Sequence, residues 1–266
     1  MADAPTKDQA FATEGIKPLE RPSASARLLM SVVGWAERLN LRYAKLPNKW
    51  VYENSDFPWA QKLEEEWLPI RQELDRLLLR RDELPSISDI SPDATTISTD
   101  RGWKTFMLTG YGFTSKRNVA LCPNTWRTLQ CIPGLTTAMF SIFEPGKHLP
   151  PHRGAYNGVL RFHLGLVVPD HPDKIGIRVA NRICHWQEGK ALIFDDAYEH
   201  EAWNETDGLR VVLFVDFRKP LRFPASALNR LLLGLAVFTP FVREGGDNLR
   251  RWEQRFHGGT TQTPRP

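Results

Sequence analysis

The stretch PPHRGAYNGVLRFHLGLVVP, Pro150–Pro169, decides the fold of this chain. Its second half is rich in Val, Leu and Phe and is bounded by Gly and Pro, as a buried strand is. The stretch nevertheless carries His152, Arg161 and His163, whose side chains cost free energy to bury. Arg161 and His163 are two positions apart, so they point to the same face of their strand. We therefore expect a strand of a polar site inside an otherwise apolar core.

Four neighbouring stretches show the same sequence pattern, in which short apolar runs are separated by Gly, Pro, Asn and Asp. Strands at this spacing, with turn residues between them, predict a β-barrel or sandwich. NETDG, residues 204–208, is typical of a hairpin turn before a buried strand at 209–217. The four stretches are WKTFMLTGYG (103–112), TTAMFSIFEPG (136–146), IGIRVANRICHWQEGKALIFDD (175–196) and HEAWNETDGLRVVLFVDF (200–217).

Helices are expected on both sides of this barrel. Residues 58–84 repeat apolar side chains at helical spacing, with Pro69 tolerated or kinking the helix, and residues 85–102 indicate a polar loop. The predicted domains are a disordered segment (1–24), a helical prelude (25–100), a barrel (101–220) and a basic amphipathic helical tail (221–266).

Composition restricts the class of protein. The chain has 266 residues, of which 41% are hydrophobic, enough for one sizeable core with helical extensions. Cys122, Cys131 and Cys184 have no metal-type spacing, and an odd, sparse count argues against a disulfide scaffold and for a reducing compartment. The N-terminus has no apolar core of a secretory signal, and no stretch approaches the roughly 20 apolar residues of a spanning helix. We therefore expect a cytoplasmic protein.

Two terminal segments are amphipathic and carry arginines, residues 26–43 and 229–256. From Arg218 onward the chain has nine Lys and Arg against three acidic residues, although the formal net charge of the whole chain is only +4. Both segments could pack on the core or lie at the inner face of the cytoplasmic membrane. The arginines alternate with Leu, Phe and Trp, which favours a lipid surface and argues against nucleic acid.

Polar residues in consecutive strands form a candidate site. Ser141 precedes His152, which we expect to begin a strand; His200 is expected at the end of a strand, with Arg210 across the hairpin. Two imidazoles at a barrel mouth can bind a divalent metal, and an arginine deeper in can pair with the carboxylate of a keto diacid. A lone strand histidine is more often a hydrogen-bonded core residue, but the joint pattern favours a site. The carboxylate of the common His-x-Asp iron motif is missing, because Gly154 stands there.

Three motifs resemble, in order, the aspartyl/asparaginyl β-hydroxylase family of Fe(II)/2-oxoglutarate oxygenases: PHRGAYNGVLRFHLGLVVP, the spaced pattern from Trp186 to Trp203, and LRVVLFVDF. The resemblance implies a double-stranded β-helix (jelly-roll, cupin-like) core and an O2-dependent hydroxylase. It implies that His152 and His200 hold the iron and that Asp196 is a catalytic residue, hydrogen-bonded to a water on the iron. Animal members also have the His-x-Gly form. The residues implied to bind 2-oxoglutarate are Trp103, Ser141, Arg161, His163 and Arg210, the last on its distal carboxylate.

The substrate is less determined. Residues 45–74 and 121–146 resemble the bacterial lipid A and ornithine-lipid hydroxylases, which favours the acyl chain of a membrane lipid as substrate. The His-x-Gly form favours the alternative, β-hydroxylation of Asp or Asn in a peptide or protein. A third alternative, a non-catalytic barrel that binds a carboxylate or lipid, is disfavoured by the histidines and arginines in register.

Overall fold

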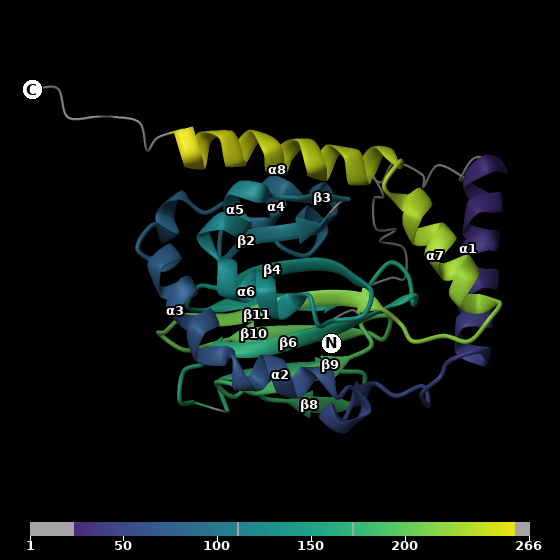
Figure 1. Ribbon diagram of the computed structural model, residues 1–266, viewed down its shortest axis with the longest axis horizontal. Coiled ribbons are helices and arrows are strands. Elements are labelled where there is room, and N and C mark those ends of the chain that lie inside the picture. The colour runs from purple at the N-terminus through teal and green to yellow at the C-terminus, as the bar shows by residue number, and fades with distance from the viewer. Residues whose placement is uncertain (1–23, 111, 172, 259–266) are drawn as a thin grey trace, which may run out of the picture.

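A computed structural model describes residues 24–258 except 111 and 172, and two antiparallel sheets form its centre (Figure 1). The larger sheet has the strand order β1-β9-β6-β11-β4-β2-β3 and the smaller one β5-β10-β7-β8. Strands β4 to β11 pass between the two sheets as a double-stranded β-helix, so the predicted jelly-roll fold is confirmed. The strands are β1 (Val51–Tyr52), β2 (Trp103–Gly110), β3 (Phe113–Thr114), β4 (Leu135–Phe143), β5 (Lys147–His152), β6 (Val159–Val167), β7 (Ile175–Val179), β8 (Arg182–Cys184), β9 (Ala191–Phe194), β10 (His200–Asn204) and β11 (Arg210–Arg218).

The centre of the larger sheet is buried on both faces. Strand β11 pairs with β4 on one side and β6 on the other, and its run VVLFV is buried throughout. One face of this sheet meets the smaller sheet, and helices cover the other, which explains an unbroken apolar run instead of strict alternation. The covering includes Trp59, whose ring packs 5.4 Å from Phe162 and 5.0 Å from Phe217.

The helical region before the barrel differs in detail from the expectation. The predicted helix over 58–84 is two helices, α2 (Trp59–Glu65) and α3 (Trp67–Leu78), separated at Glu66. Pro69 does not cause the break; it lies in the first turn of α3, where a missing N–H leaves no helical bond unmade. The short 3₁₀ helices η1 (Asn54–Asp56) and η2 (Arg81–Glu83) flank this pair, and β1 joins the larger sheet beside β9.

The expected polar loop at 85–102 is partly helical. It contains α4 (Ile87–Ile90) and the 3₁₀ helix η3 (Pro92–Thr96), and both Ile87 and Ile90 are buried. Two polar residues cap this helix: Ser86, at the N-cap position, and Asp89 form a capping box at the start of α4. The prediction failed because the two buried side chains are too few to produce a periodic signal.

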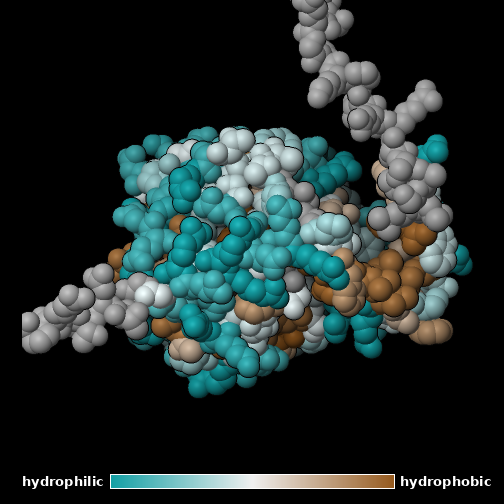
Figure 2. Space-filling model, turned by 90° about the horizontal axis from the view of Figure 1, so that it is seen from above, coloured by the Kyte–Doolittle hydropathy of each residue, from teal (hydrophilic) through white to brown (hydrophobic). Residues whose placement is uncertain are grey.

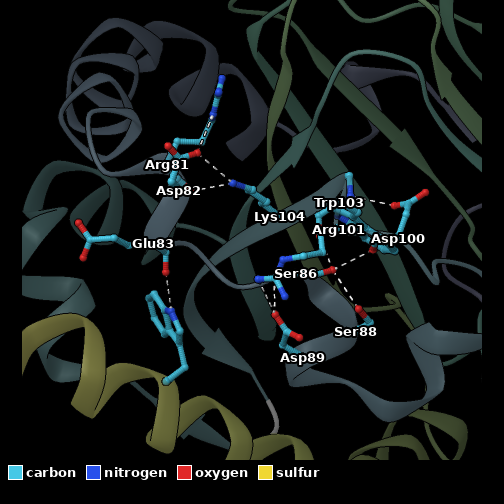
Figure 3. A network of polar contacts seen from close by, with 12 residues as sticks. Arg81, Asp82, Glu83, Ser86, Ser88, Asp89, Asp100, Arg101, Trp103 and Lys104 are labelled. Atoms are coloured by element: carbon cyan, nitrogen blue, oxygen red, sulfur yellow. Dashed lines mark hydrogen bonds and ion pairs between the residues drawn. The ribbon is translucent and has the colours of Figure 1, made fainter.

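A polar network fastens this segment to the beginning of β2 (Figure 3). The Ser86 hydroxyl donates to the Trp103 carbonyl at 3.3 Å, and the Lys104 ammonium donates to the Arg81 carbonyl at 3.0 Å. The Trp252 indole of the last helix donates to the Glu83 carbonyl at 3.0 Å. The network therefore holds Trp103, a predicted site residue, in place from outside the barrel.

The terminal helices have two different environments. Helix α8 (Pro240–Gly258) packs on the barrel through Leu249, Trp252 and Phe256, and the ring of Phe106 lies 6.0 Å from Trp252. Helices α1 (Ala24–Arg42) and α7 (Ala225–Ala236) lie side by side at one end of the molecule (Figure 1). Short helices α5 (Lys116–Leu121) and α6 (Pro123–Leu129) complete the fold.

No helix among the described residues is long and apolar enough to cross a bilayer. The segment expected to be disordered, 1–24, lies outside the described residues except for Ala24, which begins α1. The domain boundaries after residues 100 and 220 stay predictions.

Candidate functional site

Two histidines meet at one edge of the smaller sheet. His152 is the last residue of β5 and His200 the first of β10, and the two are direct partners in the antiparallel register. Their ring centroids are 4.2 Å apart. The expectation that His152 begins a strand and His200 ends one is wrong. Pro150 and Pro151 are accommodated in β5 because it is an edge strand.

Both imidazoles are prepared as neutral donors to a metal. His152 Nδ1 lies 2.8 Å from the Pro150 carbonyl, and His200 Nδ1 lies 2.9 Å from the Tyr198 carbonyl. A carbonyl only accepts, so each Nδ1 carries the proton and each Nε2 keeps its lone pair. Burial lowers the pKa of His152 and lowers that of His200 to about 3, where the charges of Arg161 and His152 add to the effect.

Asp196 occupies the space where the missing carboxylate of a His-x-Asp motif would lie. The Gly154 amide donates to the Asp196 carbonyl at 2.8 Å, and a Cβ on Gly154 would come within 2.3 Å of Asp196 Oδ2. A side chain at position 154 is therefore excluded while Asp196 keeps its place. Among the described residues no three His, Cys, Asp or Glu side chains are grouped to hold a metal, so the two histidines would leave most of its coordination positions open.

Arg161 is engaged by two carboxylates. Its Nη2 lies 2.9 Å from Asp196 Oδ2 and its Nε lies 2.8 Å from Asp216 Oδ1, while its guanidinium lies over the Phe214 ring at 4.3 Å. Burial opposes the charge of Arg161, but the two carboxylates outweigh it and raise its pKa. Burial raises the pKa of Asp196 to about 7. The positive charge of Arg161 lowers this pKa, but the negative charge of Asp216, which shares the same guanidinium, raises it again. Arg161 is at the site, but its charge is already compensated.

Arg210, in contrast, is a buried cation without a counter-ion. Its side chain is 1% exposed and lies against the rings of Phe143 at 3.4 Å and Trp186 at 4.5 Å. Within the described part of the chain, Nε and Nη1 of Arg210 have no hydrogen-bond partner. Arg210 also takes part in none of the ion pairs among the described residues. Burial alone lowers the pKa of Arg210 to about 9, so the group is still charged at pH 7. Such a group requires an anion from outside the chain.

The remaining predicted residues surround the same inner space. The Trp186 indole donates to His163 Nδ1 at 3.2 Å, which puts the proton of His163 on Nε2, and that buried nitrogen has no partner. The Ser141 hydroxyl accepts from the Trp103 indole at 3.0 Å and keeps its own proton to donate. Burial, followed by the charge of Arg210, lowers the pKa of His163 well below its ordinary value. His163 and Arg210 both contact Trp186, and a small dicarboxylate would satisfy their unpaired donors.

Sequence reasoning missed Trp186, Phe143 and Asp216. Trp186 begins the second of the three family-like motifs, but its indole contact with His163 depends on strands brought together by the fold. Asp216 is the cross-strand partner of Arg161 in the β6–β11 register, and that pairing was the signal that could have found it.

A cavity of about 850 Å³ leads from this site toward the terminal helices. One end is polar, with His152, Arg161 and Asp196 in its wall. The apolar side chains along it come from the barrel, the loop before β2, α7 and α8: Ile97, Met107, Met139, Phe214, Leu233, Val237 and Val242. A cavity of this size and lining fits an elongated apolar group whose reacting carbon lies beside His152.

Known proteins resemble the chain over most of its length. The family model "Aspartyl/Asparaginyl beta-hydroxylase" matches residues 64–220. The chain is 62% identical over 254 residues to an ornithine lipid ester-linked acyl 2-hydroxylase of Rhizobium tropici, covering 96% of this chain and 90% of that protein. It is 35% identical over 177 residues to an aspartyl/asparaginyl beta-hydroxylase of Homo sapiens, covering 61% of this chain but only 23% of the human protein.

A prolyl-4-hydroxylase of Pseudomonas putida aligns with a TM-score of 0.37 at 17% identity, over 57% of this chain and 87% of that one.

Proposed function

The chain belongs to the aspartyl/asparaginyl β-hydroxylase family, an enzyme family, and on that premise we propose that it is an Fe(II)- and 2-oxoglutarate-dependent oxygenase that hydroxylates an acyl chain of a membrane lipid. The observation that carries the substrate class is the largely apolar cavity that has His152 in its wall. The 62% identity to a hydroxylase of ornithine-lipid acyl chains supports the same substrate class.

His152 and His200 would hold the iron, because the Nε2 lone pair of each is available to a metal and their charged forms are suppressed by burial. Arg210, His163 and Ser141 would bind 2-oxoglutarate through donors that have no other acceptor in the pocket. When bound, iron and 2-oxoglutarate supply with O2 the oxidation that yields succinate, CO2 and a hydroxylated C–H.

The other polar residues orient and enclose the reactants. Trp103 fixes Ser141 through its indole, and Trp186 fixes the protonated nitrogen of His163. The Arg161–Asp196 ion pair keeps a carboxyl group beside Gly154, close to the histidines, and Arg161 shares its charge between this group and Asp216. The buried rings of Phe143 and Trp186 shield Arg210 from water, which strengthens its pairing with a substrate carboxylate.

The lipid substrate implies a place for the reaction. We propose that the enzyme acts in the cytoplasm at the inner face of the cytoplasmic membrane and that it has no nucleic-acid partner. The peptide alternative rests on the 35% identity to the human protein, and the apolar cavity disfavours a polar Asp or Asn side chain as the reacting group.

The test is succinate formation by the purified, iron-loaded chain with 2-oxoglutarate, in detergent, with ornithine lipid, total membrane lipid or an Asp-containing peptide added. The expected result is lipid-stimulated succinate and an acyl chain heavier by one oxygen atom. His152→Ala should abolish both, while His148→Ala, an exposed histidine of the same strand paired with Glu201, should retain them. Stimulation by peptide alone would replace the lipid with a peptide substrate, and no turnover would refute the oxygenase.

A further inference from the structure

Within residues 24–258, an apolar face is exposed at the end of the molecule where α1 and α7 lie (Figure 2). Trp35 of α1, Leu235 of α7 and Phe238 just beyond α7 are 52%, 52% and 63% exposed. Met30, Val32 and Leu231 on the same two helices are exposed as well. Large apolar side chains gathered on one surface, instead of scattered, mark an interaction site. We call this surface the α1–α7 face.

The two helices are firmly attached, so their exposure does not come from loose packing. Buried Asn40 of α1 donates to the Asn157 amide oxygen at 2.9 Å and to the Tyr156 hydroxyl at 3.0 Å. Buried Asn229 of α7 donates to the Gly158 carbonyl at 2.7 Å. Both helices are therefore pinned by one polar side chain each to the loop that follows His152, and their apolar sides point away from it.

The charges of the α1–α7 face have one dominant sign. The two helices contain Arg27, Arg38, Arg42 and Arg230, all exposed, and a single acidic residue, Glu37. Glu37 faces the protein, where its carboxylate accepts a hydrogen bond from the backbone N–H of Asn157 at 3.3 Å. An apolar surface bordered by arginines and lacking exposed carboxylates complements an anionic bilayer, into which Trp and Leu insert while arginines contact headgroups.

Helix α7 contributes both to the α1–α7 face and to the wall of the site cavity. Arg230, Leu233 and Val237 of the α7 region line the same cavity as His152. A lipid in a bilayer contacting this face would have its headgroup near Arg230 and a path for its chain along Leu233 and Val237. A partner that only anchors the protein would not need this connection between the exposed face and the cavity.

We propose that the α1–α7 face is the membrane-docking surface of the enzyme and that it binds an anionic bilayer so that an acyl chain enters the cavity beside α7. This proposal deepens the lipid-hydroxylase function and rests on it for its purpose, although docking itself is measurable without turnover.

The experiment is co-sedimentation of the full chain with vesicles of phosphatidylcholine alone or with 30% phosphatidylglycerol. Wild type should bind the anionic vesicles at least ten-fold better than the neutral ones. Trp35→Ser with Leu235→Ser should lower the partition coefficient on anionic vesicles ten-fold or more. The matched control removes two apolar residues of similar exposure elsewhere, Leu79→Ser (87% exposed) with Ile183→Ser (58% exposed), and should change binding less than two-fold.

Activity separates docking from chemistry. The Trp35/Leu235 variant should hydroxylate lipid in detergent as fast as wild type but lose at least five-fold on vesicles, because neither residue lines the cavity. Failure of wild type to bind anionic vesicles, or equal binding by this variant, would overturn the docking proposal. A wild-type dimer that this double variant dissociates, without vesicle binding, would assign the face to self-association instead. Vesicle binding without lipid turnover in detergent would support docking and refute the lipid-hydroxylase function.

Discussion

Replacing Arg210 with Met should make the ligand-free protein more stable while removing its response to 2-oxoglutarate. Burial lowers the pKa of Arg210 from 12.5 to about 9, which at 1.36 kcal/mol per pKa unit is a penalty of about 5 kcal/mol. The folded-state pKa lies below the unfolded one, so this penalty is complete at pH 7 and fades only as the pH rises through about 9. The rings of Phe143 and Trp186 offset about 2 kcal/mol of it through cation–π contacts.

The net expectation for Arg210→Met is a gain of roughly 1–3 kcal/mol in the free energy of unfolding without ligand, since Met retains most of the apolar packing. Arg161→Met is the matched comparison, because it removes the other inward arginine. Its loss leaves buried Asp196 and half-buried Asp216 without a counter-ion, so that variant should lose about 3–5 kcal/mol.

Urea unfolding followed by tryptophan fluorescence measures both effects, with a divalent metal present and with or without 2-oxoglutarate. Saturating 2-oxoglutarate at 100 times its Kd should stabilise wild type by about 2.7 kcal/mol and Arg210→Met by almost nothing. The reasoning is refuted if ligand-free Arg210→Met is less stable than wild type by more than about 1 kcal/mol, or if it keeps the ligand response. The first result would mean that the charge of Arg210 is compensated inside the protein, and the second that another group binds the carboxylate of 2-oxoglutarate.

Three further predictions concern the surroundings of the site. Gly154→Ala puts a Cβ 2.3 Å from Asp196 Oδ2 and should cost about 1–3 kcal/mol, and adding Asp196→Ala should recover at least 1 kcal/mol; additive effects in this double-mutant cycle would contradict the clash. Lys219→Met should lower the free energy of unfolding in urea by about 3–5 kcal/mol, because it leaves the buried carboxylate of Asp195, 2.7 Å from the Lys219 ammonium, without a counter-ion. A loss below about 1 kcal/mol, as for an exposed ion pair, would show that water reaches the pair. The pKa of His200 is lowered to about 3, so below pH 6.5 the unfolded chain binds a proton at His200 that the metal-free folded protein does not bind. His200 should therefore account for about 2 kcal/mol of the stability lost between pH 7 and 5. A His200→Gln variant with the same pH dependence of unfolding would disprove this assignment.

The strands and most of the site residues were predictable from local patterns. Residues 209–217 read as a buried strand because each residue of the apolar run prefers extended backbone and shows no helical period, and β11 lies at Arg210–Arg218. Arg161 and His163 share a face because the side-chain period of a strand is two. These are properties of single segments, and a segment carries them wherever it packs.

Contacts between segments were not predictable. The sequence names His152 and Arg210, but only the β5–β10 register brings His152 opposite His200, and only the closed barrel leaves Arg210 without a carboxylate. Asp196 filling the space above Gly154 likewise depends on two loops that meet.

The terminal segments show the same division between sequence and structure. Their amphipathic pattern could have served either a core or a membrane. In the fold α8 lies on the barrel through Trp252 and Phe256, while α1 and α7 pair with each other and keep an apolar face exposed. Periodicity determines that a helix has an apolar side. What covers that side is decided by the free energy of burying it against surfaces that exist only once the chain has folded.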